Sequence, residues 1–189
     1  MTTICAYAII ALFMFVERRL RQVKAAQSLE TGKDDQNSTR RVGQAFAIMF
    51  VALLLAPFLN TFGVGTINID WLAWRGVILM LVGLGLRIWA SRTLGAFYRR
   101  TLLIQTEQKI VDSGPYRFIR NPGYLGALIM FISAGFAVMN WISVIVIGVA
   151  MVNAYFYRIR SEETMLESAF GEHFAEYKAR SWRLIPLIY

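Results

Sequence analysis

The stretch GPYRFIRNPGYLG, residues 114–126, leads directly into an apolar segment, ALIMFISAGFAVM, residues 127–139. Its two prolines restrict the backbone where the apolar segment begins, and its three glycines allow close backbone approach. Arg120 and Asn121 stand just before the second proline. A simple helix start does not require this combination. The stretch therefore predicts a polar site at the mouth of a membrane helix.

The composition is that of a membrane protein. Of the 189 residues, 57% are hydrophobic, and the mean hydropathy is +0.48, whereas soluble domains contain about 45–50% apolar residues. The apolar residues gather in long runs, as expected for segments that lie in a bilayer. Cys5 and His173 are the only residues of their kinds. An intrachain disulfide is excluded, and neither a metal site nor a Ser-His-Asp triad is expected.

Long apolar segments predict an all-α integral membrane protein with about five transmembrane helices. The last two segments are separated by Asn140 alone, so we expect them to form a tight antiparallel hairpin. The expected segments are residues 3–16, 44–62, 71–90, 123–139 and 141–157.

The basic residues predict how the chain is oriented. Eighteen of the 20 Lys and Arg residues lie in 18–41, 92–120 and 158–183, all on one side of a five-helix arrangement. The opposite connections carry none. By the positive-inside rule, the N-terminus should be outside and the C-terminus in the cytoplasm. The expected location is the cell membrane of a bacterium or an archaeon.

The segment after Tyr157 changes character and predicts an amphipathic helix on the cytoplasmic face. Its apolar residues recur at steps of three and four, as on one face of a helix. They are Leu166, Phe170, Phe174 and Tyr177.

Two polar segments should meet at the cytoplasmic end of the predicted hairpin. The loop that ends in Arg120 and Asn121 precedes one arm, and residues 158–163 follow the other. Arg158 and Glu162 are four residues apart, so they share one face of a helix. Carboxylates can accept hydrogen bonds from an ammonium group or from hydroxyls, and a guanidinium binds a carboxylate as a fork. The cluster is therefore suited to a zwitterionic ligand.

Each of these features also has an ordinary role. Arginines at a cytoplasmic helix end commonly orient the chain and contact lipid head groups. The pair Gly83 and Gly85 is more typical of a helix-packing notch than of a cofactor loop.

The order and spacing of these segments resemble a known family. The opening stretch, the hairpin, RIRSEETMLESAFGEHFAEYKAR (158–180) and RLIP (183–186) are similar to the isoprenylcysteine carboxyl methyltransferase family, with its G-x-Y-x-x-x-R-H-P-x-Y motif. LRIWASRTLG, residues 86–95, resembles the exit of the family's third helix. The resemblance covers residues 86–186, about half of the chain.

The resemblance implies a membrane enzyme that transfers a methyl group from S-adenosyl-L-methionine to an amphiphilic, lipid-like acceptor. A carboxylate such as that of an isoprenylcysteine is the first expectation, and the product is then a methyl ester. The cofactor would sit on the cytoplasmic side, closed in by the loop before the motif and by the C-terminal segment. The acceptor would enter from the bilayer, and no nucleic acid is expected as a partner.

The site residues are carried over position by position. Among the alternatives, we prefer Arg158 with Glu162 because that pair shares a helix face. The implied acceptor-side residues are Arg120, Tyr124, and Arg158 or Arg160. The implied cofactor contacts are Gln108, Lys109, Ile110, Val111, Tyr116, Asn121, Pro122, Gly123, Tyr124, and Glu162 or Glu163.

The sequence departs from the family pattern at two positions. Asn121 and Gln108 stand where the family has histidines. Both side chains retain hydrogen-bonding capacity but cannot carry a positive charge. A mechanism that needs a histidine proton acceptor there is not available. Transfer to an acceptor that is already a carboxylate does not need one, since alignment and exclusion of water supply much of the acceleration.

Two other functions compete with this interpretation. One is a phospholipid N-methyltransferase, whose amine acceptor would favour a carboxylate near the methyl group. The other is a non-catalytic membrane protein that retains the fold, because a fold does not fix a function.

The resemblance also implies a division of the chain within one membrane domain, 1–189. Residues 1–62 would supply two N-terminal helices joined by a polar linker, 21–41. Residues 71–189 would form the catalytic core.

Overall fold

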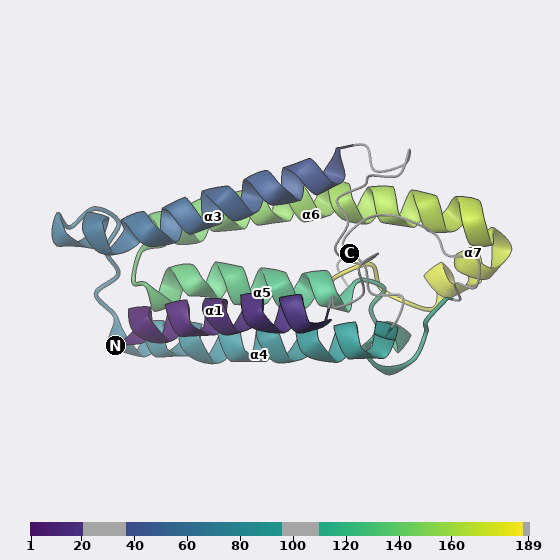
Figure 1. The fold of residues 1–189 in the computed structure, drawn as a ribbon, viewed down its shortest axis with the longest axis horizontal. Helices are drawn as coiled ribbons and strands as arrows, with labels where there is room; N and C mark the ends of the chain where they lie inside the picture. The colour runs from purple at the N-terminus through teal and green to yellow at the C-terminus, as the bar shows by residue number, and fades with distance from the viewer. Residues whose placement is uncertain (21–36, 96–109, 187–189) are drawn as a thin grey trace.

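The computed structural model describes residues 1–20, 37–95 and 110–186, and these ranges are helical except for short connections that include turns and two isolated bridges. The predicted all-α fold is confirmed (Figure 1). The helices are α1 (Thr2–Leu20), α3 (Ser38–Thr61), α4 (Asp70–Leu94), the short 3₁₀ helix η3 (Gly114–Arg117), α5 (Pro122–Ala137), α6 (Trp141–Phe170) and α7 (Glu172–Ala179).

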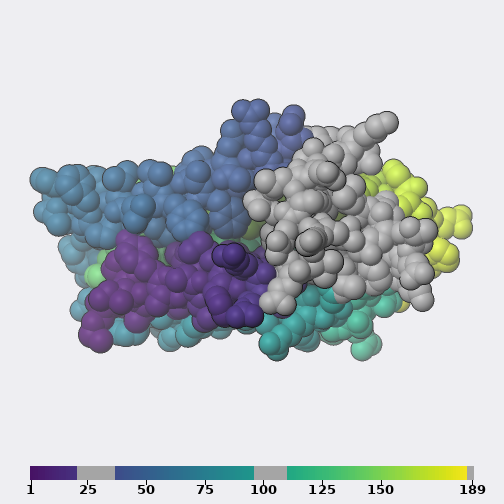
Figure 2. All heavy atoms as spheres, in the orientation of Figure 1, coloured from purple at the N-terminus to yellow at the C-terminus, as the bar shows by residue number. Residues whose placement is uncertain are grey.

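The bundle is organised around α5. Helix α3 lies along α6, whereas α1 and α4 pack together on the other side of α5 (Figure 1). Phe131 of α5 is fully buried, and the rings of Phe13 from α1 and Phe46 from α3 meet it edge-on, each at a centroid distance of 5.2 Å. On the outside, α1 and α3 lie next to each other on the face shown in Figure 2.

Each of the five predicted apolar segments corresponds to a helix. Among the described helices, α3, α4 and α6 are long and apolar enough to cross a membrane by length and hydropathy. Helix α5 is apolar but has 16 residues, which is about 24 Å at 1.5 Å per residue. Helix α1 has 19 residues and ends in a charged turn with Arg18 and Arg19.

The last apolar segment and the polar residues after it belong to one continuous helix. Helix α6 does not stop near Tyr157 but continues to Phe170, so the expected amphipathic helix is divided between the end of α6 and α7. The break falls at Gly171, whose φ of 51° suits glycine. The predicted linker also ends early, because residues 38–41 form the first turn of α3. Its residues 21–36 lie outside the described ranges.

Helices α4 and α5 approach closely through two glycines. A Cβ atom on Gly83 would lie 2.5 Å from the carbonyl oxygen of Gly126, and one on Gly126 would lie 2.6 Å from that of Gly83. By contrast, a Cβ atom on Gly85 would meet nothing within 4 Å. The notch interpretation is therefore confirmed for Gly83.

The turn of the α5–α6 hairpin is held by hydrogen bonds of Asn140, at the end of the bundle opposite to Arg120 and residues 158–163. Asn140 is fully buried and caps α6 by accepting a hydrogen bond from the Ser143 main-chain N–H at 3.0 Å. Its carboxamide nitrogen donates to Asn60 Oδ1 at 2.8 Å and to the Val64 carbonyl at 2.9 Å. These bonds join the hairpin to the connection between α3 and α4.

Candidate active site

The motif loop, residues 114–121, folds against the end of α4. Gly114 has a φ of 56°, and a Cβ atom there would lie 3.1 Å from Thr93 Oγ1 on α4. Pro115 and Tyr116 are buried within η3. Pro122 is the first residue of α5, where its missing N–H costs nothing. The two prolines thus fix the loop at both ends, as the sequence predicted.

Glu163 of α6 forms hydrogen bonds with polar side chains of the motif loop and of the C-terminal segment. Its side chain is 5% exposed. It accepts hydrogen bonds from Arg120 Nε at 3.1 Å, from Arg183 Nε at 2.6 Å, and from Asn121 Nδ2 at 3.5 Å. The predicted meeting of Arg120 and Asn121 with residues 158–163 is confirmed. Two guanidinium groups share this one carboxylate, which explains how it can be buried.

The C-terminal segment 177–183 is bound to the motif loop along its length. Arg120 Nη1 donates to the carbonyl oxygens of Lys178, at 3.1 Å, and of Ser181. The main chain of Trp182 donates to the Phe118 carbonyl and accepts from the Arg120 N–H, both at 2.8 Å. The guanidinium of Arg120 therefore holds this segment in place as well as pairing with Glu163.

A tyrosine completes this attachment. Tyr177 Oη donates to the Tyr116 carbonyl at 2.7 Å. Burial raises the pKa of the Tyr177 phenol above its ordinary value. A phenol is already a donor at neutral pH, and the shift extends this to more alkaline pH.

A second cluster of polar side chains lies near the start of α5. Tyr124 Oη donates to Glu162 Oε2 at 2.7 Å and accepts from Arg158 Nε at 3.3 Å. Arg158 is 4% exposed. Its Nη1 also donates to the hydroxyls of Ser38 and Thr39, at 3.0 Å each. Arg158 and Glu162 thus share a helix face, as predicted, and both contact the same tyrosine from α5.

The remaining predicted residues are distributed more widely. Arg160 is exposed and lies over the ring of Phe156, 5.5 Å from the ring centroid, so it does not join the cluster. Ile110 and Val111 are half-buried and lead into η3. A Cβ atom on Gly123 would lie 3.2 Å from Arg87 Nη1. Gln108 and Lys109 lie outside the described residues.

Several contacts of this region were not predicted. Ser38 and Thr39, at the start of α3, accept hydrogen bonds from Arg158. Arg183 donates to Glu163, whereas the sequence indicated Arg183 only as part of the RLIP stretch that resembles the family. Arg87 of α4 forms a buried ion pair with Glu17 of α1, Nε to Oε1 at 2.8 Å. The sequence did contain a signal for this ion pair. Arg87 is a charged residue within an apolar helix, and such residues usually pair with another group inside the bundle.

The two arginines of the cluster therefore have different surroundings. Arg120 pairs with a buried carboxylate and with carbonyl oxygens of the C-terminal segment. Among its described contacts, Arg158 donates to the hydroxyl groups of Tyr124, Ser38 and Thr39.

The chain shows similarity to known proteins over most of its length. The family model described as phospholipid methyltransferase matches residues 71–173. A protein-S-isoprenylcysteine O-methyltransferase of Dictyostelium discoideum is 31% identical over 161 residues, which is 81% of this chain and 64% of that protein. Protein-S-isoprenylcysteine O-methyltransferase B of Arabidopsis thaliana is 30% identical over 120 residues, or 62% of this chain and 61% of that protein.

A solved structure shares the fold. The eukaryotic intramembrane Ras methyltransferase ICMT, an isoprenylcysteine carboxyl methyltransferase, matches with a TM-score of 0.70 at 22% identity. The match covers 97% of this chain and 65% of that one. The chain thus spans less than two thirds of the length of these relatives.

These similarities confirm the predicted resemblance and an integral membrane fold. The family model covers more than half of the chain, residues 71–173 of 189, and includes both the motif loop and the polar residues of α6. The chain therefore belongs to the phospholipid methyltransferase family, and it is similar to the isoprenylcysteine carboxyl methyltransferases.

Proposed function

We propose that this protein transfers a methyl group from S-adenosyl-L-methionine to the carboxylate of a lipid-like acceptor of the isoprenylcysteine class. The observation that carries the proposal is the buried guanidinium of Arg158, beside Tyr124 and Glu162 where α5 begins. A cationic fork suits a carboxylate and repels a protonated amine. The names of the two curated relatives favour the same acceptor chemistry.

The donor set of the site fits the proposed cofactor. Glu162 is half-buried, and its Oε2 accepts from Tyr124, so its second oxygen is the one we assign to a ribose hydroxyl or an ammonium group. Glu163 accepts from three side chains, and we assign it to holding the loop instead. S-adenosyl-L-methionine would supply the methyl group as a sulfonium. We propose that the rest of the cofactor site is formed by residues 108–111, 116 and 121–124.

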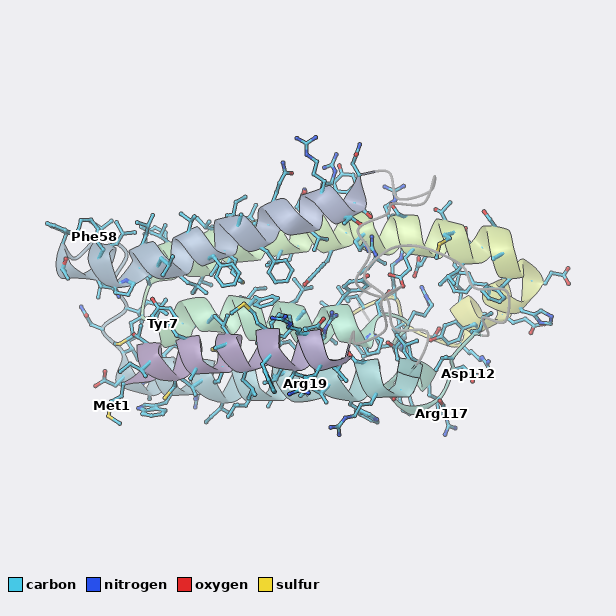
Figure 3. The ribbon with its side chains drawn as sticks, in the orientation of Figure 1. Met1, Tyr7, Arg19, Phe58, Asp112 and Arg117 are labelled. Atoms are coloured by element: carbon cyan, nitrogen blue, oxygen red, sulfur yellow. The ribbon has the colours of Figure 1, made fainter. Side chains whose placement is uncertain are left out.

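We also propose an orientation of the chain in the membrane and separate roles for its two parts. Asp112, just before the motif loop, and Arg117 within it lie toward the end of the molecule away from Met1, and Arg19 of α1 lies between them and Met1 (Figure 3). The positive-inside rule assigns this end to the cytoplasm. Residues 71–189 would carry the catalytic core, and residues 1–62 would support it from α1 and α3. The acceptor would reach the site from the bilayer.

The test is a methyl-transfer assay on purified protein with radiolabelled S-adenosyl-L-methionine and an S-prenylcysteine. The product is treated with mild base, which releases methanol from a methyl ester but does not cleave an N-methyl group. We expect base-labile label in the prenylcysteine. Base-stable label in a phospholipid fraction would instead establish the N-methyltransferase alternative, which the name of the matched family model raises.

A matched pair of variants tests the assignment of Arg158. Arg158→Lys keeps the charge but loses the fork, so transfer should fall by about tenfold to a hundredfold. Arg160→Lys is the control, because Arg160 is exposed on the same helix and lies over Phe156. Both variants should still bind S-adenosylhomocysteine in calorimetry. Equal activity of the two variants would remove Arg158 from the acceptor site.

A further inference from the structure

We propose that the start of α3 and the neighbouring part of α6 together bind the head group of an anionic phospholipid. Arg41 of α3 lies over the ring of Tyr157 on α6, 4.0 Å from the ring centroid. Arg160 of α6 lies over the ring of Phe156, 5.5 Å from its centroid. All four residues are exposed. Because α3 lies along α6 (Figure 1), the two helices present two arginines at one pair of aromatic rings.

These contacts mark the level at which two apolar segments leave the membrane. Residues 42–62 and 141–157 contain no charged side chain, and α3 and α6 are both long and apolar enough to cross a membrane. Arg41 directly precedes the first of these segments, and Tyr157 ends the second. Because Arg41 contacts Tyr157, the two segments end at the same level. Phospholipid head groups lie at that level of a bilayer, and so do aromatic side chains of membrane proteins.

The two arginines converge on the same face of α6. The ring centroids of Phe156 and Tyr157 are 5.9 Å apart. Arg160 follows Phe156 by four residues and Tyr157 by three, so it lies on the same face, one turn further from the apolar segment. Arg41 reaches this face from α3. A guanidinium that lies over a ring still has N–H groups at its edge, and these bind phosphate oxygens as a fork.

The charge of this surface selects an anion. Helix α3 contains no acidic residue, and α6 contains none before Glu162. Arg40, beside Arg41, is also exposed. An anionic phospholipid carries a phosphate with no compensating ammonium group, and basic residues at a membrane surface attract such lipids. The position at the boundary of two apolar segments favours a lipid over an acidic protein.

Arg19 of α1 provides a matched control. It is exposed and lies over the ring of Phe15, four residues earlier, at 5.2 Å from the centroid. Arg160 has the same spacing from Phe156. The contact of Arg19 lies within one helix, whereas Arg41 and Arg160 come from two helices. Arg19→Gln therefore removes the same charge and the same kind of ring contact outside the proposed lipid site.

The experiment titrates phosphatidylglycerol into phosphatidylcholine micelles that contain the full-length protein, and measures its melting temperature. A ligand that binds only the folded protein raises the melting temperature in proportion to its affinity and concentration. Concentrated salt is used throughout because it screens diffuse surface attraction. We expect phosphatidylglycerol to stabilise the wild type. Arg41→Gln and Arg160→Gln should each weaken its apparent affinity about tenfold, and Arg19→Gln should leave it unchanged.

Three results would overturn the proposal. The first is a wild type that phosphatidylglycerol does not stabilise, and the second is an equal loss of affinity in all three variants, which would indicate diffuse attraction. The third is an equal response to glycerol 3-phosphate, which would mean that the surface binds a free phosphate and not a lipid. If Arg41→Gln does not fold, Arg160→Gln against Arg19→Gln gives the same comparison. The measurement does not use methyl transfer, so it is independent of the proposed function.

Discussion

Helix α3 contains a proline, and a tyrosine on another helix provides the hydrogen bond that the proline removes. Pro57 has no N–H, so the carbonyl of Leu53, four residues earlier, lacks its usual helical donor. Tyr7 Oη of α1 donates to that carbonyl at 2.7 Å. Figure 3 shows Tyr7 toward the same end of the bundle as Met1 and Phe58. We predict that Tyr7 and Pro57 are energetically coupled through Leu53.

The size of the coupling follows from the cost of an unsatisfied carbonyl. A buried acceptor that loses its donor costs about 1–3 kcal/mol in soluble proteins. Hydrogen bonds between membrane helices average about 0.6 kcal/mol and reach about 1.7 kcal/mol. We therefore expect Tyr7→Phe to lower the free energy of unfolding by about 1 kcal/mol. In Pro57→Ala, the new N–H at position 57 can donate to Leu53, so Tyr7→Phe should then cost close to nothing.

A double-mutant cycle measures this coupling. The four proteins are unfolded reversibly in mixed micelles, and the effect of Tyr7→Phe is compared between the two backgrounds. The comparison cancels any change that Pro57→Ala makes to the bend of α3. If Tyr7→Phe costs the same with proline and with alanine at position 57, the tyrosine does not compensate for the proline.

Two further substitutions probe the packing that supports the site. Gly83→Ala should lower the melting temperature and the yield of folded protein, because its Cβ would lie 2.5 Å from a carbonyl oxygen on α5. Gly85→Ala is the control and should change neither quantity, because its Cβ would meet nothing within 4 Å. Equal melting temperatures in heated samples analysed by size exclusion would contradict the glycine contact. Glu17→Gln removes the charge of Glu17 from this buried pair, in which the Glu17 side chain is 11% exposed and that of Arg87 is 10% exposed, and should cost about 3–5 kcal/mol. Adding Arg87→Gln should recover part of that loss, and a double variant less stable than Glu17→Gln would refute the pairing.

Much of the fold could be predicted because the relevant signals are local. The apolar runs determine the helices, and Asn140 between two such runs requires a hairpin. Once the hairpin is given, Arg120 must lie near residues 158–163, and Arg158 and Glu162 must share a face. These inferences need only helix geometry and the sequence order.

The helices extend beyond the apolar segments because polarity marks the limits of a membrane span and not the ends of a helix. Glu162 and Glu163 indicate the end of a membrane span, but a helix can leave the membrane and continue in water. The residues between Tyr157 and Phe170 include neither glycine nor proline, so nothing in the backbone interrupts α6. Gly171 is the first residue that favours a break. The start of α3 was misplaced for the same reason.

Contacts between distant residues could not be predicted from periodicity. Arg158 meets Ser38 across 120 residues, and Arg87 meets Glu17 across 70. Each contact depends on which helices are neighbours, and a sequence pattern gives only the face that a helix buries. The resemblance to a family did not supply them either, because it covers residues 86–186 and leaves out α1 and α3.

The different surroundings of Arg120 and Arg158 follow from the positions of two adjacent carboxylates on α6. In the sequence, Arg120 and Arg158 looked equivalent, since each was expected at the cytoplasmic end of a membrane helix. Helix α6 presents Glu162 and Glu163 on successive residues, which point about 100° apart around the helix axis. Glu163 therefore faces the loop and the C-terminal segment, where it pairs with Arg120, and Glu162 faces Tyr124. Adjacent glutamates thus belong to two different polar clusters, one that joins Arg120 to the C-terminal segment and one that joins Tyr124 to Arg158.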